Sequence, residues 1–283
     1  MIAGIFLNSV VIISLWRTSQ LRKKLCYFTI FVLSCFDLSV VVINHPIIMA
    51  SAIVTTAFGV HDKLFVDITE YISTLIVELA VSALQTLTFE RFLALTYPFF
   101  HERMVTKKRL IYFLALLQFL AIVMATLTFG DYVLSKHMLF SILIPFIFLL
   151  SIYLNYKTIM IARSKRRDER VAPASNHEIV KRTRFNLKKM STCSLAVICC
   201  FVCFFPHLVY SLYFETSERR LRRENDQAFM SWTWTTTAGC ANSTFNCLIL
   251  FWRNTVLRRE GMKIVKNIHS RCCCVCISSF RNA

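Results

Sequence analysis

The chain has 283 residues, 56% of them hydrophobic, and carries a formal net charge of +17 at pH 7. That apolar fraction exceeds what a soluble domain carries, so the composition excludes an ordinary water-soluble protein and favours a protein of the lipid bilayer. The positive charge does not indicate nucleic acid, because the basic residues cluster at the edges of apolar segments, where anionic lipid head groups lie.

Seven apolar segments approach or exceed the roughly 20 residues that a helix needs to cross the hydrocarbon core of a membrane. They run approximately from Met1 to Trp16, Cys26 to Ile53, Ile68 to Thr88, Leu110 to Phe129, Met138 to Ile161, Met190 to Phe214 and Phe229 to Phe251. None shows the alternation of polar and apolar residues that marks a membrane β-strand. The sequence therefore predicts an all-α membrane protein, with a seven-transmembrane helix bundle over residues 1–252 and a cytoplasmic segment over residues 253–283.

The distribution of Lys and Arg predicts how the bundle is oriented. Of the 33 basic residues, 26 lie in three alternate loops or after the last segment, and 6 lie in the loops of the opposite side. Loops rich in Lys and Arg stay in the cytoplasm. We therefore expect the amino terminus outside the cell and the carboxyl terminus inside it.

The stretch from Arg253 to Ile268 has the pattern of a short amphipathic eighth helix that lies on the membrane. Its apolar side consists of Leu257, Ile264, Val265 and Ile268, and its polar side of Arg258, Arg259, Lys263 and Lys266. Such a helix would anchor the tail to lipid. A solvated basic linker is the alternative.

A cluster of cysteines follows, made of Cys272, Cys273, Cys274 and Cys276. Thiols after a basic amphipathic stretch suit S-palmitoylation. A zinc site is the competing interpretation, and His269 is its one nearby histidine. None of the 12 cysteines falls in a predicted extracellular loop. No outer disulfide is therefore expected, and the thiols within spans are interpreted as small packing residues.

An ion pair stands at the inner edge of the third segment, where Glu90 and Arg91 precede Phe92. Charged groups are costly at the edge of the hydrocarbon core, so those that a chain carries there are functional candidates. The placement favours a switch over a solubilising charge.

Together with motifs in other segments, this triplet resembles the rhodopsin-like (class A) family of G-protein-coupled receptors. The matching stretches are Leu7-Asn8-Ser9-Val10-Val11, Leu33-Ser34-Cys35-Phe36-Asp37-Leu38, Glu90-Arg91-Phe92, Pro145 with Tyr153, Cys203-Phe204-Phe205-Pro206 and Asn242-Ser243-Thr244-Phe245-Asn246. Each motif alone is a weak signal. Their order, with one in most segments, makes the resemblance specific.

The resemblance implies a plasma-membrane receptor that passes the binding of an extracellular ligand to a cytoplasmic heterotrimeric G protein. In the family, the sixth helix moves outward at its inner end, and Pro206 would bend that helix because proline removes a backbone hydrogen bond. The implied activation switch consists of Glu90, Arg91, Phe92, Tyr153, Cys203, Phe204, Pro206 and Asn246. No cofactor is implied, and the absence of nucleophile, phosphate-loop and HExxH-type motifs argues against an enzyme.

Four polar residues within the predicted spans would be costly against lipid, namely Asn8, Asp37, Asn242 and Asn246. We expect them to converge inside the bundle. There they either form a structural hydrogen-bonded cluster or hold water and a sodium ion at Asp37. Both interpretations stay open at this point.

A candidate ligand pocket is expected in the outer half of the bundle. Glu70, Ser73 and Val77 fall on the same helix face as Arg91. The full predicted set is Glu70, Ser73, Val77, Phe204, His207, Tyr210, Trp232 and Thr236. Core packing is the alternative for each aromatic residue. Ser73 stands where amine receptors carry an aspartate, so the resemblance disfavours an amine ligand.

Several positions depart from the family pattern. Cys247 and Leu250 replace the proline and tyrosine of the seventh-helix motif, and Gln118 replaces the fourth-helix tryptophan. Asn186 stands where many members carry the acid that pairs with the third-helix arginine. Glu90 is then the expected partner of Arg91, and a weak lock with raised ligand-free activity follows as a hypothesis.

These departures keep two other interpretations open. The first is a receptor-derived membrane protein that no longer signals, either a dimer partner or a decayed copy. A transporter is less favoured, because no internal repeat is found. The first segment would rise only about 24 Å, so we also expect that one or two of its helical turns are missing at the amino terminus.

Overall fold

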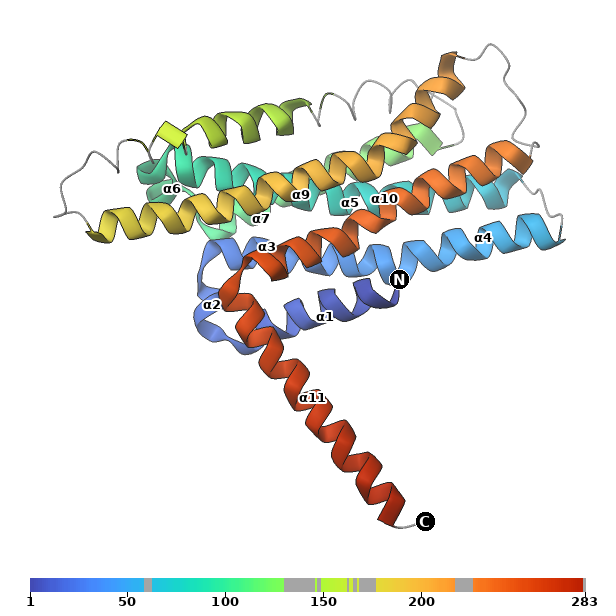
Figure 1. Cartoon of the computed structure of the whole chain (residues 1–283). Helices are drawn as coiled ribbons and strands as arrows, with labels where there is room; N and C mark the ends of the chain where they lie inside the picture. Colours follow the sequence, from blue (N-terminus) through green and yellow to red (C-terminus); the bar gives the residue numbers. More distant parts are fainter. Residues whose placement is uncertain are drawn as a thin grey trace.

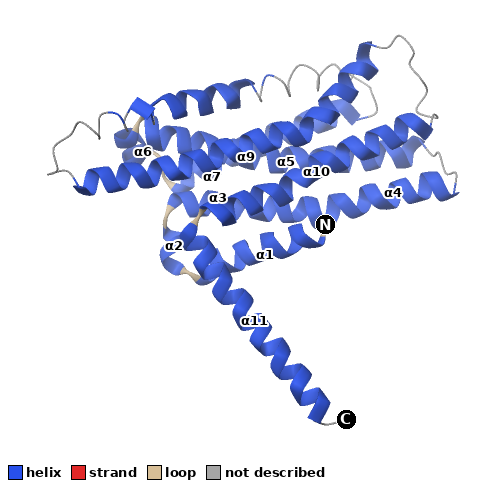
Figure 2. Cartoon of the chain, in the orientation of Figure 1, coloured by secondary structure: helices blue, strands red, loops and turns tan. Residues whose placement is uncertain are grey.

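The computed structural model describes residues 1–58, 63–129, 146, 149–161, 163–164, 167, 177–216 and 226–281. The secondary-structure elements within these ranges are helices, as predicted (Figure 2). Most of them run side by side in an elongated bundle, which the last helix leaves at one end (Figure 1). Of the predicted fifth span, Met138 to Ile161, residues 138–145, 147 and 148 lie outside the described residues, and Pro145 is among them.

In chain order, the helices are α1 (Ile2–Arg17), α2 (Ser19–Lys23), α3 (Leu25–Ser39), η1 (Val40–Asn44), α4 (His45–Phe58), α5 (Lys63–Thr96), α6 (Pro98–Met104), α7 (Lys107–Thr128), α9 (His177–Thr216), α10 (Asp226–Arg253) and α11 (Thr255–Arg281). Residues 149–161, between α7 and α9, are also helical. The short helices α2 and α6 lie at the same end of the bundle, where they join α1 to α3 and α5 to α7 (Figure 1).

Four helical stretches among the described residues are long and apolar enough to cross a membrane. They are Leu25–Ala57, Leu64–Thr96, Lys107–Leu127 and Ser194–Tyr213, and α1 is a shorter apolar helix. A helix also forms at α10, where a span is predicted, but its many Ser, Thr and Asn residues make it less apolar. The chain is therefore a multi-pass helical membrane protein, and the number of seven spans stays a prediction.

The second span contains a π turn in its middle. Pro46 has no N–H to donate to the carbonyl of Val42, so the regular α-helical pattern cannot continue through this point. The chain instead forms the π turn η1 over Val40–Asn44 before α4 begins. Asn44 is fully buried at its end, and its Nδ2 donates to Sγ of Cys240 on α10 at 3.3 Å. The π turn thus places a polar contact between the second span and α10.

The hydrophobic core joins α3, α5, α9 and α10. Leu33, Leu84, Cys200 and Cys247 supply one completely buried side chain from each of these helices, and all four belong to one cluster. Two of the four are thiols, which pack here as small apolar side chains. The core therefore lies between the helices that carry the predicted switch motifs.

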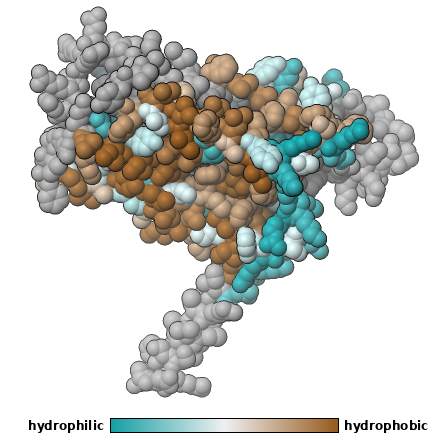
Figure 3. All heavy atoms as spheres, turned by 180° about the vertical axis from the view of Figure 1, so that it is seen from behind, coloured by the Kyte–Doolittle hydropathy of each residue, from teal (hydrophilic) through white to brown (hydrophobic). Residues whose placement is uncertain are grey.

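The outer surface of the bundle is apolar on the face that Figure 3 shows. On α7, Tyr112 and Phe119 are 72% and 62% exposed, an arrangement that suits contact with lipid chains. Hydrophilic side chains gather at the end where α11 leaves the bundle (Figure 3). Lys23, Lys24 and Lys108 are exposed at the connections of that end.

The beginning of α11 packs against the bundle. Leu257 is fully buried and Ile264 is nearly so, in agreement with the predicted apolar side of this helix. Oδ1 of Asn254 accepts a hydrogen bond from the backbone N–H of Leu257 at 3.2 Å, which caps the first turn of α11. Further along, α11 stands away from the other helices (Figure 1).

The helix α11 is longer than the predicted short segment, because no proline or glycine interrupts the chain between Ile268 and Arg281. On its exposed side, the Lys263 ammonium lies 3.0 Å from the Glu260 carboxylate and holds the pKa of that carboxyl below its usual value. The side chains of Cys272, Cys273, Cys274 and Cys276 lie outside the described part of the structure, so palmitoylation stays a prediction.

The replacement Gly261→Ala is expected to loosen α11 from the bundle. A Cβ atom at this position would lie 2.5 Å from Cε2 of Phe251 and 3.1 Å from Cγ1 of Val10. Overpacking of this kind costs about 1–3 kcal/mol. The thermal unfolding midpoint of the protein in detergent micelles should therefore fall by several degrees. The neighbouring Met262 is 46% exposed, so Met262→Ala is the control, and equal midpoints for the two variants would contradict the packing described.

Candidate functional site

The inner end of α5 places Glu90 and Arg91 within the protein. Both side chains are buried, with Glu90 1% and Arg91 7% exposed, and the apolar residues Leu87 and Leu95 on the same helix are buried beside them. The helix ends at Thr96 because Pro98 follows, and a proline disfavours helical backbone in the residue before it. Pro98 then begins α6, which turns the chain back toward the end of α5.

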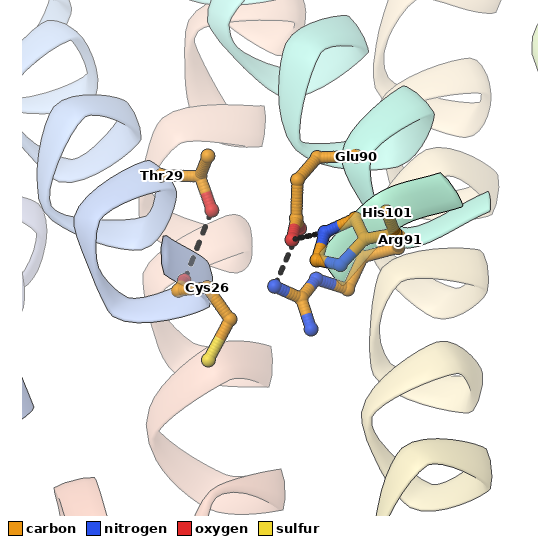
Figure 4. A network of polar contacts seen from close by, with 5 residues as sticks. All are labelled: Cys26, Thr29, Glu90, Arg91 and His101. Carbon is orange, nitrogen blue, oxygen red and sulfur yellow. Dashed lines mark hydrogen bonds and ion pairs between the residues drawn. The ribbon is translucent and has the colours of Figure 1, made fainter. Parts of the chain in front are cut away.

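The Glu90 carboxylate contacts two side chains, the Arg91 guanidinium and the His101 imidazole (Figure 4). Its Oε2 forms an ion pair with the Arg91 guanidinium, and its Oε1 lies 2.9 Å from Nε2 of His101 on α6. Adjacent side chains of a helix do not face each other, so the long Arg91 side chain folds back to reach Glu90. The carboxylate therefore ties the end of α5 to α6, which follows it in the chain.

The helix α3 faces this ion pair. Figure 4 shows Cys26 and Thr29 of α3 across from Glu90 and Arg91, with the Thr29 hydroxyl donating to the Cys26 carbonyl at 2.9 Å. Tyr27, on the same helix, is 2% exposed and lies within electrostatic range of Arg91. Its hydroxyl is 3.5 Å from Oδ1 of Asn254, the cap of α11. Arg91 thus lies between α5 and α3, and Tyr27 of α3 links this region to the base of α11.

The other predicted switch residues lie at different places. Phe92 packs edge to face with Tyr97, at 6.5 Å between ring centroids. Tyr153 is 54% exposed, and the Lys157 ammonium lies 5.5 Å from its ring centroid. The described contacts therefore place Tyr153 at the surface of helix 149–161, and its expected role beside Arg91 stays untested.

The sixth-helix motif lies in the middle of α9. Pro206 interrupts the hydrogen bonding within this helix, and α9 changes direction along its length (Figure 1). The Phe204 ring packs on Gly239 of α10, where a Cβ atom would lie 3.0 Å from Cε1 of the ring. Cys203 beside it is buried, as is Asn246 on α10. The motif therefore touches α10 through an aromatic ring at the point where α9 can bend.

The four predicted buried polar residues lie on α1, α3 and α10. Asn8, Asp37, Asn242 and Asn246 are all at most 4% exposed. Nδ2 of Asn8 donates to the carbonyls of Gly4 at 3.0 Å and of Ser243 at 3.3 Å. The second bond joins α1 directly to α10.

The Asp37 carboxyl lies beside Ser243 and Asn246. Neither of its oxygens makes a hydrogen bond of good geometry with a residue that the structure describes, although both are completely buried. The donor set of this cluster is one carboxylate with hydroxyl and amide groups. Among the described residues, no group of three or more His, Cys, Asp or Glu side chains is placed to hold a metal ion. The cluster therefore has the chemistry of a water or sodium site at most.

The predicted ligand pocket draws its residues from α5, α9 and α10. Nδ1 of His207 lies 3.4 Å from Oγ1 of Thr235, and the His207 and Tyr210 rings are 6.5 Å apart. The Glu70 carboxylate lies close enough to Tyr210 to interact electrostatically. The structure thus brings three members of the predicted set, Glu70, His207 and Tyr210, to the same region.

The remaining members are distributed around that region. Ser73 on α5 is 2% exposed, and Val77 packs on the buried cluster of Val40, Ile48, Ala80 and Cys240. Trp232 and Thr236 on α10 are half-buried. Ligand binding by this set stays a prediction.

Residues 7–130 match the family model described as 7 transmembrane receptor (rhodopsin family). The match supports the assignment of the chain to the rhodopsin-like receptor family. No curated protein matches the chain. The matched residues include Asn8, Asp37 and the Glu90-Arg91-Phe92 triplet, so three of the motifs lie within the family match. Those on α9 and α10 lie beyond it.

The chain contains site residues that sequence reasoning missed. His101 follows Glu90 by 11 residues, and only the reversal of the chain between α5 and α6 brings the two together. A second group consists of Gln85, Ser151, Asn155 and Ser194, which hydrogen-bond to one another across three helices. Their polarity within apolar segments was the one signal available from the sequence.

The replacement Glu90→Gln is expected to destabilise the protein, because it leaves the buried Arg91 guanidinium without its carboxylate. Removal of one partner of a buried ion pair costs about 3 kcal/mol. The exposed Glu102 on α6 supplies the control, and Glu102→Gln should change stability by less than about 0.5 kcal/mol. Thermal unfolding in detergent micelles measures both. A midpoint for Glu90→Gln as high as for Glu102→Gln would mean that the ion pair contributes nothing.

Proposed function

We propose that the chain is a G-protein-coupled receptor, which transmits the binding of an extracellular ligand to a cytoplasmic heterotrimeric G protein by outward movement of α9. The observation that carries the proposal is the buried Glu90–Arg91 ion pair at the inner end of α5, within the part of the chain that matches the family. A buried charge pair at a membrane edge is expensive to keep for structure alone.

The mechanism is a shift between two arrangements of the bundle. In the resting arrangement, Glu90 neutralises Arg91 and also binds His101. Bending of α9 at Pro206 opens a groove at the inner end, where Arg91 becomes available to the G protein. The ligand drives this shift only if it binds the open arrangement better than the closed one. Glu70, His207 and Tyr210 are the proposed centre of the ligand pocket.

The buried polar cluster at Asp37 is the proposed regulator between the pocket and the switch. One carboxylate and the amide oxygens of Asn8, Asn242 and Asn246 are hard ligands, which suit water or a small cation such as sodium. A cation that binds one arrangement of the helices better than the other would bias the receptor toward it. The cluster lies where α1, α3 and α10 meet, so movement of any of them changes its geometry.

The exposed basic residues support a cytoplasmic position for the end that carries Glu90 and Arg91. Arg17, Lys23, Lys24, Arg103 and Lys108 are exposed on the helices of this end, where Figure 3 shows hydrophilic side chains. By the positive-inside rule, this end faces the cytoplasm of a plasma-membrane protein. We take residues 1–252 as the receptor domain and residues 253–283 as a cytoplasmic tail, which palmitoylated cysteines would fix to the membrane.

The orientation is tested with epitope tags in transfected cells. An amino-terminal tag should bind antibody on intact cells, because the first helix starts outside. A tag after Ala283 should bind antibody only after permeabilisation. The reverse pattern of the two tags would overturn the orientation and, with it, the cytoplasmic position of Arg91.

Signalling is tested by Arg91→Ala in cells that report each class of heterotrimeric G protein. We expect ligand-free activation above that of mock-transfected cells and its loss in Arg91→Ala, because the arginine is the proposed contact of the G protein. Arg109, which is exposed and donates to the Met104 carbonyl at 2.8 Å, supplies the control. The variant Arg109→Ala should retain the signal.

The same experiment distinguishes the receptor proposal from the second interpretation, in which the chain is a receptor-derived protein that does not signal. That interpretation is favoured by Cys247 and Leu250, which are buried apolar residues of α10 at the positions of the family's proline and tyrosine. Surface expression without activation of any G-protein class, with or without candidate ligands, would support it and reject the receptor proposal.

A further inference from the structure

A chain of hydrogen bonds crosses three helices between the core and the inner end of the bundle. Oγ of Ser194 on α9 donates to Oδ1 of Asn155 at 2.9 Å. Nδ2 of Asn155 donates to the Ser151 carbonyl at 2.8 Å, and Oγ of Ser151 donates to Oε1 of Gln85 on α5 at 2.5 Å. The Asn155 bond to the Ser151 carbonyl runs within helix 149–161, so this helix carries two interhelical hydrogen bonds, one to Ser194 of α9 and one to Gln85 of α5.

We call the hydrogen bonds that run from Ser194 through Asn155 and Ser151 to Gln85 the relay. Three of its side chains are buried away from lipid and water. Ser151 is 1%, Ser194 4% and Asn155 7% exposed. A buried amide or hydroxyl that loses its partner keeps the full cost of its desolvation. The relay therefore holds α9, helix 149–161 and α5 together, and separation of α9 from its neighbour must leave Asn155 and Ser194 without each other.

Other hydroxyl groups of this receptor bond differently. Ser14, Ser39, Thr56, Thr86, Thr88 and Thr126 each donate to the carbonyl four residues earlier in their own helix. This local bond satisfies the hydroxyl without any second helix. Ser194 and Ser151 instead donate to side chains of neighbouring helices. Their bonds thus depend on how the helices are arranged.

Ser194 lies far enough along α9 from Pro206 that a small change in the bend of the helix would break its hydrogen bond. Ser194 precedes Pro206 by 12 residues, which is about 18 Å of helix. A change of about 10° in the bend at Pro206 would displace Ser194 by about 3 Å, enough to break its hydrogen bond. Gln85, at the other end of the relay, lies about 9 Å along α5 from Arg91. The relay therefore joins the part of α9 that would move to the helix that carries the switch.

We propose that Asn155 and Ser194 are positioning residues that clasp the inner half of α9 to helix 149–161 in the resting receptor, and that opening of this clasp is a step of activation. The inference rests on the proposed function in one respect, since it takes α9 as the moving helix. It assigns the restraint on α9 to a neutral hydrogen bond, whereas Glu90 restrains Arg91 within its own helix and α6.

Cys200 provides a native reporter of α9. This thiol is completely buried and lies between Ser194 and Pro206, so its reaction with a maleimide requires α9 to open. In purified full-length protein in detergent micelles, Ser194→Ala should raise the labelling rate of Cys200 about fivefold, the factor that corresponds to one buried hydrogen bond. Peptide mass spectrometry assigns the label to individual cysteines. Asn155→Ala should have the same effect, and the double variant should add nothing to either.

Three measurements separate a clasp from a general loss of stability. The labelling rates of Cys26 on α3 and Cys240 on α10, both buried, should not change, whereas global destabilisation would raise them together with Cys200. Ser194→Thr keeps the hydroxyl and should restore slow labelling of Cys200. Ser211→Ala removes an equally buried serine of α9 beyond Pro206 and should leave the rate unchanged.

The proposal is overturned if Ser194→Ala and Asn155→Ala label Cys200 at the original rate, or if Cys26 and Cys240 accelerate equally. Ligand-free G-protein activation should rise in the same two variants. If Cys200 labelling rises while no variant activates any G protein, the clasp is supported and the signalling proposal fails. The two failures are therefore distinguishable.

Discussion

A polar group inside a bilayer must find its partner within the protein, because hydrocarbon offers none. This constraint explains several hydrogen bonds between helices that are far apart in the sequence. Asn8 reaches α10 through the Ser243 carbonyl, Asn44 reaches it through Cys240, and Gln118 on α7 donates both to the Leu79 carbonyl and to Ser82 on α5. Each contact joins two helices, and apolar packing alone would leave little preference for one relative position of these helices over another. The polar groups therefore determine which faces of the helices meet.

The same constraint connects the two ends of the proposed mechanism. At the inner end, the Glu90 carboxylate is divided between Arg91 and His101, so the charge pair and the α6 connection depend on one residue. In the middle, Asp37 is surrounded by neutral hydroxyl and amide groups that any helix movement rearranges. Packing adds a third link, since Phe204 lies directly on Gly239. Phe204 belongs to α9, so bending of this helix would disturb its contact with Gly239 of α10 directly.

Sequence patterns predicted the helices of the described part of the chain, and they indicated that Asn8, Asp37, Asn242 and Asn246, all of which are buried, would avoid lipid. Both inferences were possible because hydrophobicity and the cost of polar groups in lipid are local properties. They did not predict His101 beside Glu90 or Asn155 beside Ser194, since such pairs depend on the angles at which helices turn back and pack. Tyr153 and Asn155 illustrate the limit. Both are polar residues of one apolar segment, two positions apart, and only packing decides that Asn155 is buried and Tyr153 exposed.

The π turn at Val40–Asn44 has a consequence for the register of the outer half of the second span. A helix advances by about 100° per residue, so one additional residue in a turn rotates everything beyond it by that angle. Beyond the turn, Ser51 and Thr55 are buried whereas Met49 and Ile53 are about half exposed. A regular α-helix of the same sequence would turn the two hydroxyl groups toward lipid. The winding of these five residues thus determines which side chains of α4 face the interior of the bundle.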